Sequence, residues 1–162
     1  MSGKQLRAII DTNVYEFLYK QDLERVAALI ENGILVVYGC KIIREELREM
    51  SKDFKIKGKN YRIILIGIYD RLVGKHFIPT DKLVDVLSEE YWVNYIGNVP
   101  KRKIFSDFQI VATATIHSLD IIVSEDNRTM KSDNAIKSYN IVNGRNGFVT
   151  PKFVSLEELI RL

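Results

Sequence analysis

Near its beginning the chain reads Ala8-Ile9-Ile10-Asp11-Thr12-Asn13, a short apolar run that ends in an acid. Residues 6–10 are predicted to form a strand covered on both faces, because the apolar residues are continuous rather than alternating. An acid directly after such a strand lies at its carboxyl end, where parallel α/β proteins build their active sites. The pattern recurs at Ile121-Ile122-Val123-Ser124-Glu125-Asp126. Two carboxylates are therefore expected at one edge of a parallel sheet.

The composition is that of an ordinary globular protein. The 162 residues, 46% hydrophobic and 28% charged, fit a single domain with a sizeable core. The single cysteine, Cys40, cannot form an internal disulfide, which favours a cytoplasmic setting. With His76 and His117 as the remaining soft ligands, a structural zinc site is excluded, and any metal is expected to be a hard cation bound by oxygen.

Neither a membrane nor a nucleic acid is indicated by composition alone. No apolar run is long enough to span a bilayer, and Asp11 interrupts the first one, so no signal peptide or membrane contact is expected. The net charge of +3 is too mild to indicate nucleic acid by itself. Two basic groups are candidates for RNA contact, with solvated loops as the alternative: Lys52, Lys55, Lys57, Lys59 and Arg62, and Lys101, Arg102 and Lys103.

Strand-like and helix-like segments alternate along the chain, which predicts an α/β fold with a mostly parallel central sheet flanked by helices. Strands are expected at 6–10, 34–38, 120–124 and 148–149, with a connection or strand at 77–79, and helices at 14–31, 41–51, 61–75, 80–96, 134–142 and 156–162 and from 106 onward. Predicted N-caps are Asp22, Thr80 and Ser106, the last in a capping box with Gln109. Gly33 and a turn at 143–147 are expected to end helices. Segment 52–105 is predicted to be a helical insertion or arm within one domain, 1–162.

The helix at 41–51 carries an acid on its inner face. Ile43, Leu47 and Met50 share one side at helical spacing, and Glu46 lies within that stripe. A carboxylate on a buried face is costly unless its charge is compensated, so Glu46 is a candidate functional residue. The alternative is a Glu at the edge of the stripe or one paired with a buried Arg. The outward side is expected to carry Arg44, Glu45, Arg48 and Glu49.

The helix predicted from Ser106 repeats this feature. Asp107, Ile110 and Val111 fall on one inner face, with the acid in the first turn. A helix N-terminus favours an ionised carboxylate by roughly 0.3–1 kcal/mol, so dipole stabilisation alone is one explanation of Asp107. A functional carboxylate is the other.

Asp11, Glu46, Asp107 and Asp126 could converge on one edge of the sheet. Each pair of like charges near 4 Å costs about 4 kcal/mol at an effective dielectric of 20. A divalent cation removes that repulsion, and Mg²⁺ or Mn²⁺ with waters completing the shell is the expected ion. Such an ion lowers the pKa of a bound water and stabilises charge on a phosphoryl oxygen. Hydrolysis of a phosphodiester is the predicted chemistry.

With these residues assembled, the chain resembles the PIN-domain nucleases, including the VapC-type toxin ribonucleases. The resemblance covers nearly the whole chain, and the order and spacing of its motifs are more specific than any motif alone. The matching motifs are Ile9-Ile10-Asp11-Thr12-Asn13, Ile43-Arg44-Glu45-Glu46-Leu47-Arg48, Asp107-Phe108-Gln109-Ile110-Val111-Ala112-Thr113-Ala114, Ile122-Val123-Ser124-Glu125-Asp126 and Val149-Thr150-Pro151-Lys152-Phe153.

The resemblance implies a three-layer PIN-like domain, metal-dependent cleavage of single-stranded or structured RNA, frequent homo-oligomerisation and, for a toxin, a separate antitoxin protein. Asp11, Asp107 and Asp126 would bind the metal directly or through water, and Glu46 would be a further ligand or orient the attacking water. Two residues, Asn13 and Ser124, would donate hydrogen bonds to these carboxylates; for Ser124 the alternative is a bond within its own turn. The long basic stretch 52–105 and the extended tail after Asp126 depart from the simplest toxin pattern.

Several other residues have simpler interpretations. His117 lies about 15 Å along the helix from Asp107 and is predicted to be a core-edge histidine. Glu125 either reaches the metal or faces solvent, and the second is expected. The rings of Tyr91, Trp92 and Tyr95 either stack RNA bases or form the inner side of a helix.

Two other classes of function compete with a ribonuclease. A non-cleaving RNA-binding or scaffold protein is disfavoured, because binding to phosphate gains nothing from clustered negative charge. A phosphatase is disfavoured because Asp11-Thr12-Asn13 lacks a second Asp two residues on.

Overall fold

The computed structural model describes residues 3–50, 55–56 and 59–162. Its centre is a five-stranded sheet in the order β5-β2-β1-β6-β7, with every neighbouring pair parallel. This confirms the predicted α/β class. The strands are β1 (Leu6–Ile10), β2 (Leu35–Cys40), β5 (Phe77–Ile78), β6 (Ile121–Val123) and β7 (Lys152–Val154).

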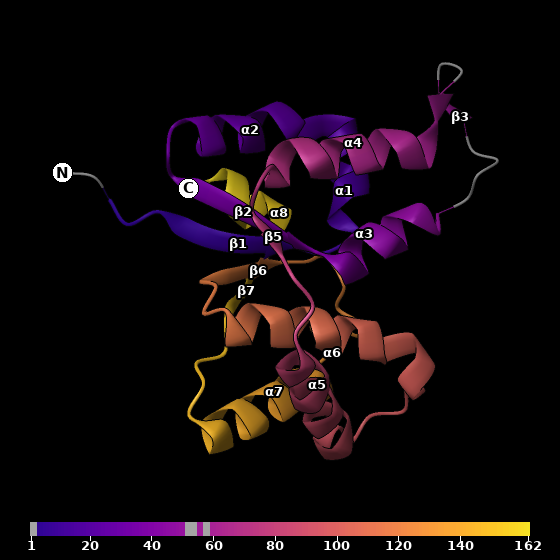
Figure 1. Cartoon of the computed structure of the whole chain (residues 1–162), viewed down its shortest axis with the longest axis vertical. Helices are drawn as coiled ribbons and strands as arrows, with labels where there is room; N and C mark the ends of the chain where they lie inside the picture. The colour runs from indigo at the N-terminus through magenta and orange to yellow at the C-terminus, as the bar shows by residue number, and fades with distance from the viewer. Residues whose placement is uncertain (1–2, 51–54, 57–58) are drawn as a thin grey trace.

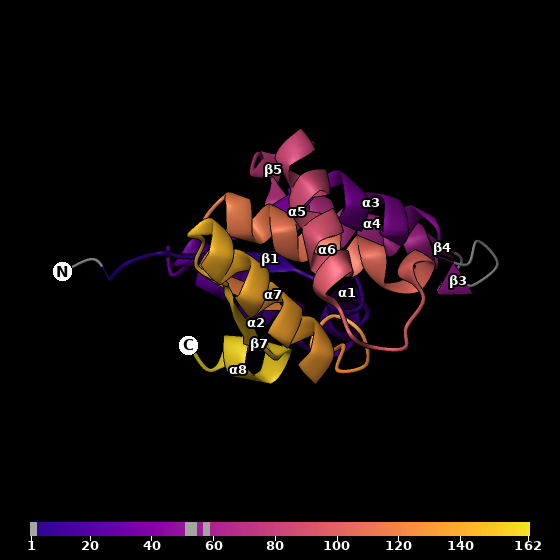
Figure 2. The same ribbon diagram turned by 90° about the horizontal axis from the view of Figure 1, so that it is seen from below.

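Helices cover both faces of the sheet, which gives three layers (Figures 1 and 2). The helices α1, α2, α4 and α8 lie on one face, and α5, α6 and α7 lie on the other, while α3 stands at the carboxyl end of β2. Their bounds are α1 Val14–Phe17, a π-helical turn Leu18–Asp22, α2 Leu23–Glu31, α3 Lys41–Arg48, α4 Tyr61–Val73, α5 Lys82–Asn94, α6 Lys101–Ile116, α7 Asp133–Asn146 and α8 Leu156–Ile160.

The core sits where the central strands meet these helices. Ile9 and Ile10 of β1 and Ile122 of β6 are fully buried, as expected for strands covered on both faces. On the α5–α7 side, Tyr91 packs edge-on against both Phe108 and Tyr139. The ring of Tyr95 also contacts Phe108, and Trp92 packs partly buried against the core. The inner-side interpretation of these aromatic residues is therefore correct.

One helix boundary was predicted wrongly near the candidate site. Helix α6 begins at Lys101 after Pro100, so Ser106 lies inside the helix and forms no capping box. Pro100 ends the preceding irregular segment, and its fixed φ suits the entry to a helix. Asp107 is consequently the seventh helical residue, beyond the first turn, and the helix dipole does not account for it.

Other expected boundaries also shift. Helix α7 continues through the predicted turn 143–147 to Asn146, and Gly147 ends it in the left-handed conformation at φ 74°. The last strand forms at 152–154 instead of 148–149. Helix α5 is capped by Asp81 rather than Thr80, because the Asp81 carboxylate accepts from the N–H of Leu83. Asp22 precedes α2 but makes no side-chain cap.

Segment 52–105, expected to be a helical arm, supplies α4, β5, α5 and the start of α6 to the layers of the fold. Its strand β5 forms one edge of the sheet beside β2. A short antiparallel pair, β3 (Lys55–Ile56) with β4 (Lys59–Asn60), stands apart from it. Predictions that concern residues 51–54 and 57–58, and the side chains of Lys55 and Lys59, lie outside the described part of the chain. None of the described helices has the length and apolar character needed to cross a membrane.

The end of β2 is held by a close approach between two elements. A Cβ placed on Gly39 would lie 2.2 Å from the hydroxyl oxygen of Tyr69, which itself donates to the carbonyl of Cys40 at 3.3 Å. We expect Gly39→Ala to lower the free energy of unfolding by about 1–3 kcal/mol, because the rigid ring must move within a packed core. Urea denaturation monitored by circular dichroism measures this change.

Gly67→Ala is the matched control. Gly67 lies within α4, and a Cβ there would meet no atom within 4 Å. Because glycine weakens a helix interior by roughly 0.5–1 kcal/mol relative to alanine, this variant should be slightly more stable than the wild type. Equal effects of the two substitutions would contradict the close-contact explanation.

Candidate active site

The strand order places a crevice at the carboxyl ends of β1 and β6. From β1 the chain builds outward to β2 and β5 on one side, then returns to add β6 and β7 on the other. Such a reversal leaves a crevice between the two central strands, at the edge where their carboxyl ends meet. Asp11 directly follows β1, and its N–H still donates to the carbonyl of Val123 at 2.8 Å. Ser124, Glu125 and Asp126 directly follow β6.

Asp11 is buried and tightly oriented, with 4% of its surface exposed. The Ser124 hydroxyl donates to Asp11 Oδ2 at 2.8 Å, and the N–H of Thr12 donates to Oδ1 at 2.8 Å. Ser124 also accepts from the N–H of Asp126 at 3.1 Å. Both interpretations of Ser124 therefore apply, because its one hydroxyl bonds its own turn and a carboxylate of the neighbouring strand.

Glu46 lies on the inner side of α3, between the buried Ile43 and Leu47. The Thr12 hydroxyl donates to Glu46 Oε1 at 3.2 Å, which connects α3 to the segment after β1. Its neighbour Glu45 faces solvent and approaches Lys41 at 3.6 Å. The helical spacing thus correctly predicted that Glu46 lies on the inner side of α3 and Glu45 on its outer side.

Asp107 reaches the same crevice from the opposite layer. It lies on α6 and is 8% exposed. Its Oδ2 lies within hydrogen-bond distance, 2.5 Å, of the hydroxyl oxygen of Thr129. The same hydroxyl also bonds Asp126 Oδ2. Thr129 therefore joins carboxylates that stand 19 positions apart along the chain.

Asp126 is organised by the turn that follows β6. Its Oδ1 accepts from the N–H groups of Arg128 at 2.9 Å and Thr129 at 3.0 Å. Burial alone would raise the pKa of Asp126, but the hydrogen bonds from the Thr129 side chain and from successive backbone N–H groups prevail and lower it below its usual value. Asp126 is thus the carboxylate most firmly kept ionised.

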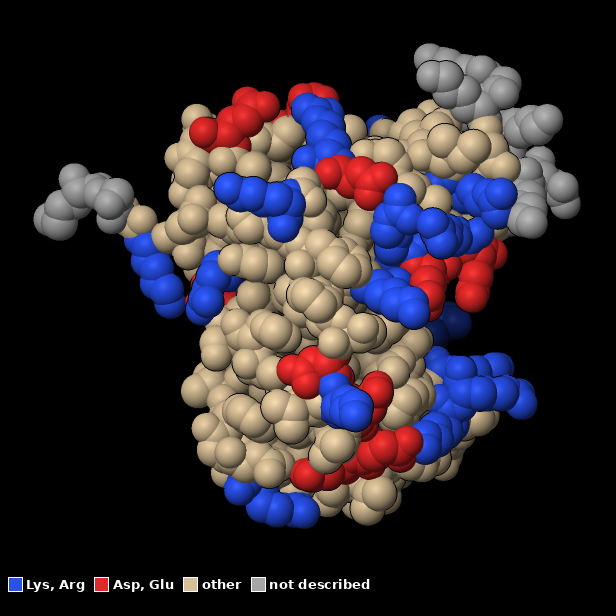
Figure 3. Space-filling model, in the orientation of Figure 1, with Lys and Arg blue, Asp and Glu red and all other residues tan. Residues whose placement is uncertain are grey.

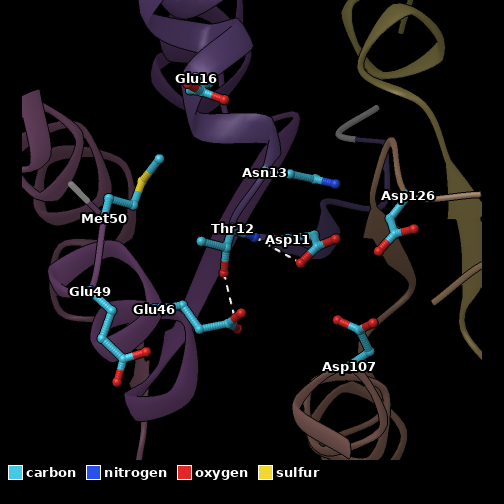
Figure 4. Close-up of a pocket in the computed structure, with 9 residues that line it drawn as sticks. All are labelled: Asp11, Thr12, Asn13, Glu16, Glu46, Glu49, Met50, Asp107 and Asp126. Carbon is cyan, nitrogen blue, oxygen red and sulfur yellow. Dashed lines mark hydrogen bonds between the residues drawn. The ribbon is translucent and has the colours of Figure 1, made fainter. Parts of the chain in front are cut away.

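The four predicted acids line one pocket of about 330 Å³ (Figure 4). Asp11 lies at its centre, with Glu46 on one side and Asp107 and Asp126 on the other. Sequence reasoning missed several wall residues, and it placed Glu49 on the outer side of α3. The full lining is Asp11, Thr12, Asn13, Glu16, Glu46, Glu49, Met50, Asp107 and Asp126.

Crowding and burial raise the pKa of three carboxyl groups in this pocket. Desolvation is the largest cause for each, and the charges of neighbouring acids add to it. The pKa of Asp11 rises to about 6, that of Glu46 to about 7 and that of Asp107 to about 8. Near neutral pH, Asp107 therefore holds a proton in the absence of a cation, which lets Asp107, Thr129 and Asp126 form a hydrogen-bonded chain.

The donors of the pocket suit a hard divalent cation. Carboxylate oxygens dominate the lining, and the Oδ1 atom of Asn13 is buried without a hydrogen-bond partner among the described residues. Within the described residues, however, no three acidic, histidine or cysteine side chains are arranged closely enough to enclose an ion. A site of one or two direct carboxylates with waters filling the shell fits this geometry, and Mg²⁺ typically binds in this way.

Two charged residues beside the pocket have other roles. Glu125 turns away from the acids, and its Oε1 accepts from the N–H of Leu156 at 2.7 Å, at the start of α8. The expectation that Glu125 simply faces solvent is therefore wrong, because its carboxylate is hydrogen-bonded within the protein. The positive charge of Lys131 acts on Asp11 and lowers its pKa, against the larger effect of burial.

No family model matches the chain, and no curated protein matches it. Solved structures do match. DNA-bound VapBC from Salmonella typhimurium superimposes with a TM-score of 0.58 and 13% identity over 93% of this chain and 98% of that chain. VapBC-1 from nontypeable Haemophilus influenzae superimposes with a TM-score of 0.56 and 13% identity, over 93% of this chain and 98% of that chain. FitAB bound to an IR36 DNA fragment superimposes with a TM-score of 0.54 and 20% identity, over 91% of this chain and 94% of that chain. The chain has the fold of a VapC-like PIN domain.

The raised pKa values predict an unusual dependence of stability on pH. From about pH 4 to about pH 8, Asp11, Glu46 and Asp107 retain protons that the unfolded chain has lost. The free energy of unfolding of the metal-free protein should therefore fall as pH rises through this window, by roughly 3 kcal/mol or more, since one carboxyl group whose pKa is raised by about two units already contributes that much. Urea denaturation in EDTA at several pH values measures the slope.

Asp107→Asn tests the origin of this slope. The amide cannot ionise, and it also relieves its neighbours of a like charge, so the fall in stability between pH 5 and pH 8 should become shallower. A metal-free wild type that gains stability over this range would show that the acids are not buried together as described.

Proposed function

We propose that this chain is a metal-dependent endoribonuclease that hydrolyses phosphodiester bonds of single-stranded RNA. One observation carries the proposal: Asp11, Glu46, Asp107 and Asp126, from four separate segments, line a single pocket at the carboxyl edge of the sheet. Such a concentration of negative charge is costly without a cation and gives no advantage to a protein that only binds phosphate. The PIN-domain fold supports the same class of activity.

The proposed reaction is addition of water to phosphorus with departure of a ribose oxygen. Asp11, Asp107 and Asp126 would hold Mg²⁺ or Mn²⁺, directly or through water. When bound, the ion supplies charge stabilisation at the phosphoryl oxygens and a lowered pKa for water. Glu46 would orient the attacking water and accept its proton. Its pKa of about 7, raised mainly by burial, suits a general base near neutral pH.

Cations on both sides of the pocket support a nucleic-acid substrate. Figure 3 shows basic side chains over α3 and α4 and over the start of α6, with acidic side chains between them. Arg48 and Lys103 are exposed, and neither has an ion pair among the described residues. Lys101, in contrast, is held by Glu89 at 2.8 Å. Unpaired cations that flank an acidic centre would fix the phosphates on either side of the scissile bond.

A toxin role is the finer form of this proposal. The structural neighbours are toxin–antitoxin complexes, and we infer that this chain likewise pairs with a separate antitoxin protein that places a basic side chain at the acidic pocket. Homo-oligomerisation is proposed on the same resemblance. The targeted RNA would be single-stranded or exposed within a larger folded RNA.

Asp11→Asn and Asp107→Asn test the ribonuclease directly. Each removes a negative charge from the pocket with little change in shape, so cleavage of a single-stranded RNA with Mg²⁺ or Mn²⁺ should fall by roughly 100-fold or more. Fluorescent oligonucleotide cleavage measures the rate. Asp81→Asn is the matched control, since Asn also caps a helix and this residue lies outside the pocket.

The outcomes separate the candidate functions. Cleavage that persists in both pocket variants would exclude the proposed site. RNA binding by the wild type without turnover under any divalent ion would instead favour the non-cleaving RNA-binding protein.

Lys103→Gln tests the proposed path of the RNA. Lys103 precedes Asp107 by four residues and shares its side of α6, one turn nearer the start of the helix. We expect binding of a non-cleaved RNA in EDTA to weaken about 3- to 10-fold, with a salt slope reduced by about 0.7 as one phosphate contact is lost. Fluorescence anisotropy at several salt concentrations measures both, and the cleavage assay should show a higher KM with little change in kcat.

Lys137→Gln provides a control of equal charge. Lys137 is exposed on α7 and does not line the acidic pocket. Equal losses in the two variants would mean that RNA responds to net charge and not to a path beside the pocket.

A further inference from the structure

We propose that Thr129 is a positioning residue that sets the affinity of the acidic pocket for its divalent ion by tethering Asp107 to Asp126. The inference rests on the proposed function, since it concerns the same pocket. Thr129 does not line the pocket itself, and none of the motifs quoted from the sequence includes it. Its importance follows from its contacts alone.

The contacts of Thr129 reach two carboxylates at once. Its hydroxyl lies 2.5 Å from Asp107 Oδ2 and also bonds Asp126 Oδ2. Its backbone N–H donates to Asp126 Oδ1 at 3.0 Å. Asp126 is therefore held through both of its oxygens by a single residue, and the hydroxyl extends that hold to Asp107 in the other layer.

Thr129 is itself firmly placed by the loop between β6 and α7. The Ser132 hydroxyl donates to its carbonyl at 2.8 Å, and the same side chain caps α7. The next residue, Met130, is fully buried, and its carbonyl accepts from the Tyr139 hydroxyl at 2.9 Å. A side chain on such an anchored loop can fix the direction of the groups it touches.

Asp107 depends on this contact more than Asp11 or Asp126 depends on any one of its own hydrogen bonds. Among the described residues, Thr129 provides the hydrogen bond that the Asp107 side chain makes, and no other is found there. Asp11 is held by both Ser124 and the N–H of Thr12. Loss of the Thr129 hydroxyl would therefore free the Asp107 rotamer, and an ion would have to order it on binding. Removal of a group that orients a metal ligand typically weakens metal binding 10- to 100-fold.

The test compares Thr129→Val with Thr129→Ser. Valine keeps the shape and removes the hydroxyl, whereas serine keeps the hydroxyl. Calorimetric titration with Mn²⁺ should give a 10- to 100-fold weaker Kd for Thr129→Val and a value within about threefold of the wild type for Thr129→Ser. In the cleavage assay, the Mg²⁺ concentration for half-maximal rate should shift in parallel. Circular dichroism in EDTA checks that both variants fold.

Thr113→Val is the matched control on α6. Its hydroxyl bonds the carbonyl of Gln109 within the helix at 2.7 Å, outside the acidic pocket, so its Mn²⁺ affinity should equal that of the wild type. If the wild type binds Mn²⁺ and Thr129→Val binds it equally well, this inference alone is overturned. It is also overturned if Thr129→Ser binds Mn²⁺ as weakly as Thr129→Val. A wild type that binds no Mn²⁺ overturns the proposed function together with it.

Discussion

Mutual repulsion among buried carboxylates is the constraint on which the site depends. Asp11 and Asp107 are almost entirely removed from water; besides burial, the charge of Asp126 raises the pKa of Asp11, and the charges of Asp11, Asp126 and Glu46 raise the pKa of Asp107. The sheet and its two helical layers must hold these groups together against that repulsion. Each acid is also steadied by a hydroxyl: Ser124 for Asp11, Thr12 for Glu46, and Thr129 for Asp107 and Asp126.

The topology explains why four distant segments can meet. Because β1 is central, with β2 on one side and β6 on the other, the residues that follow β1 and β6 emerge next to each other. Helix α3 continues directly from β2 and presents Glu46 from one flank. Helix α6 packs against the opposite face and presents Asp107. The pocket is thus a product of strand order rather than of any single motif.

The parallel sheet and the positions of the four acids could be predicted from the sequence, because buried strands and inner helix faces show as patterns of apolar residues. Continuous apolar residues mark β1 and β6, and the position of Glu46 within an apolar stripe marks the inner side of α3. Helix ends were predicted less well: Ser106 resembles a cap, yet α6 starts five residues earlier at Lys101, directly after Pro100. The contacts of Thr129 and the approach of Glu49 to the pocket leave no periodic signal in the sequence. The first depends on the turn after β6, and the second depends on how the end of α3 is oriented in the folded chain.

The distribution of these acids along the chain has a consequence for biosynthesis. Asp126 follows β6 and comes late in the order of the four acids. The outer neighbour of β6 in the sheet is β7, which ends at Val154. A chain still emerging from the ribosome can thus carry Asp11, Glu46 and even Asp107 without the edge that assembles them. The pocket therefore assembles only after the chain has been synthesised through β6 and Asp126.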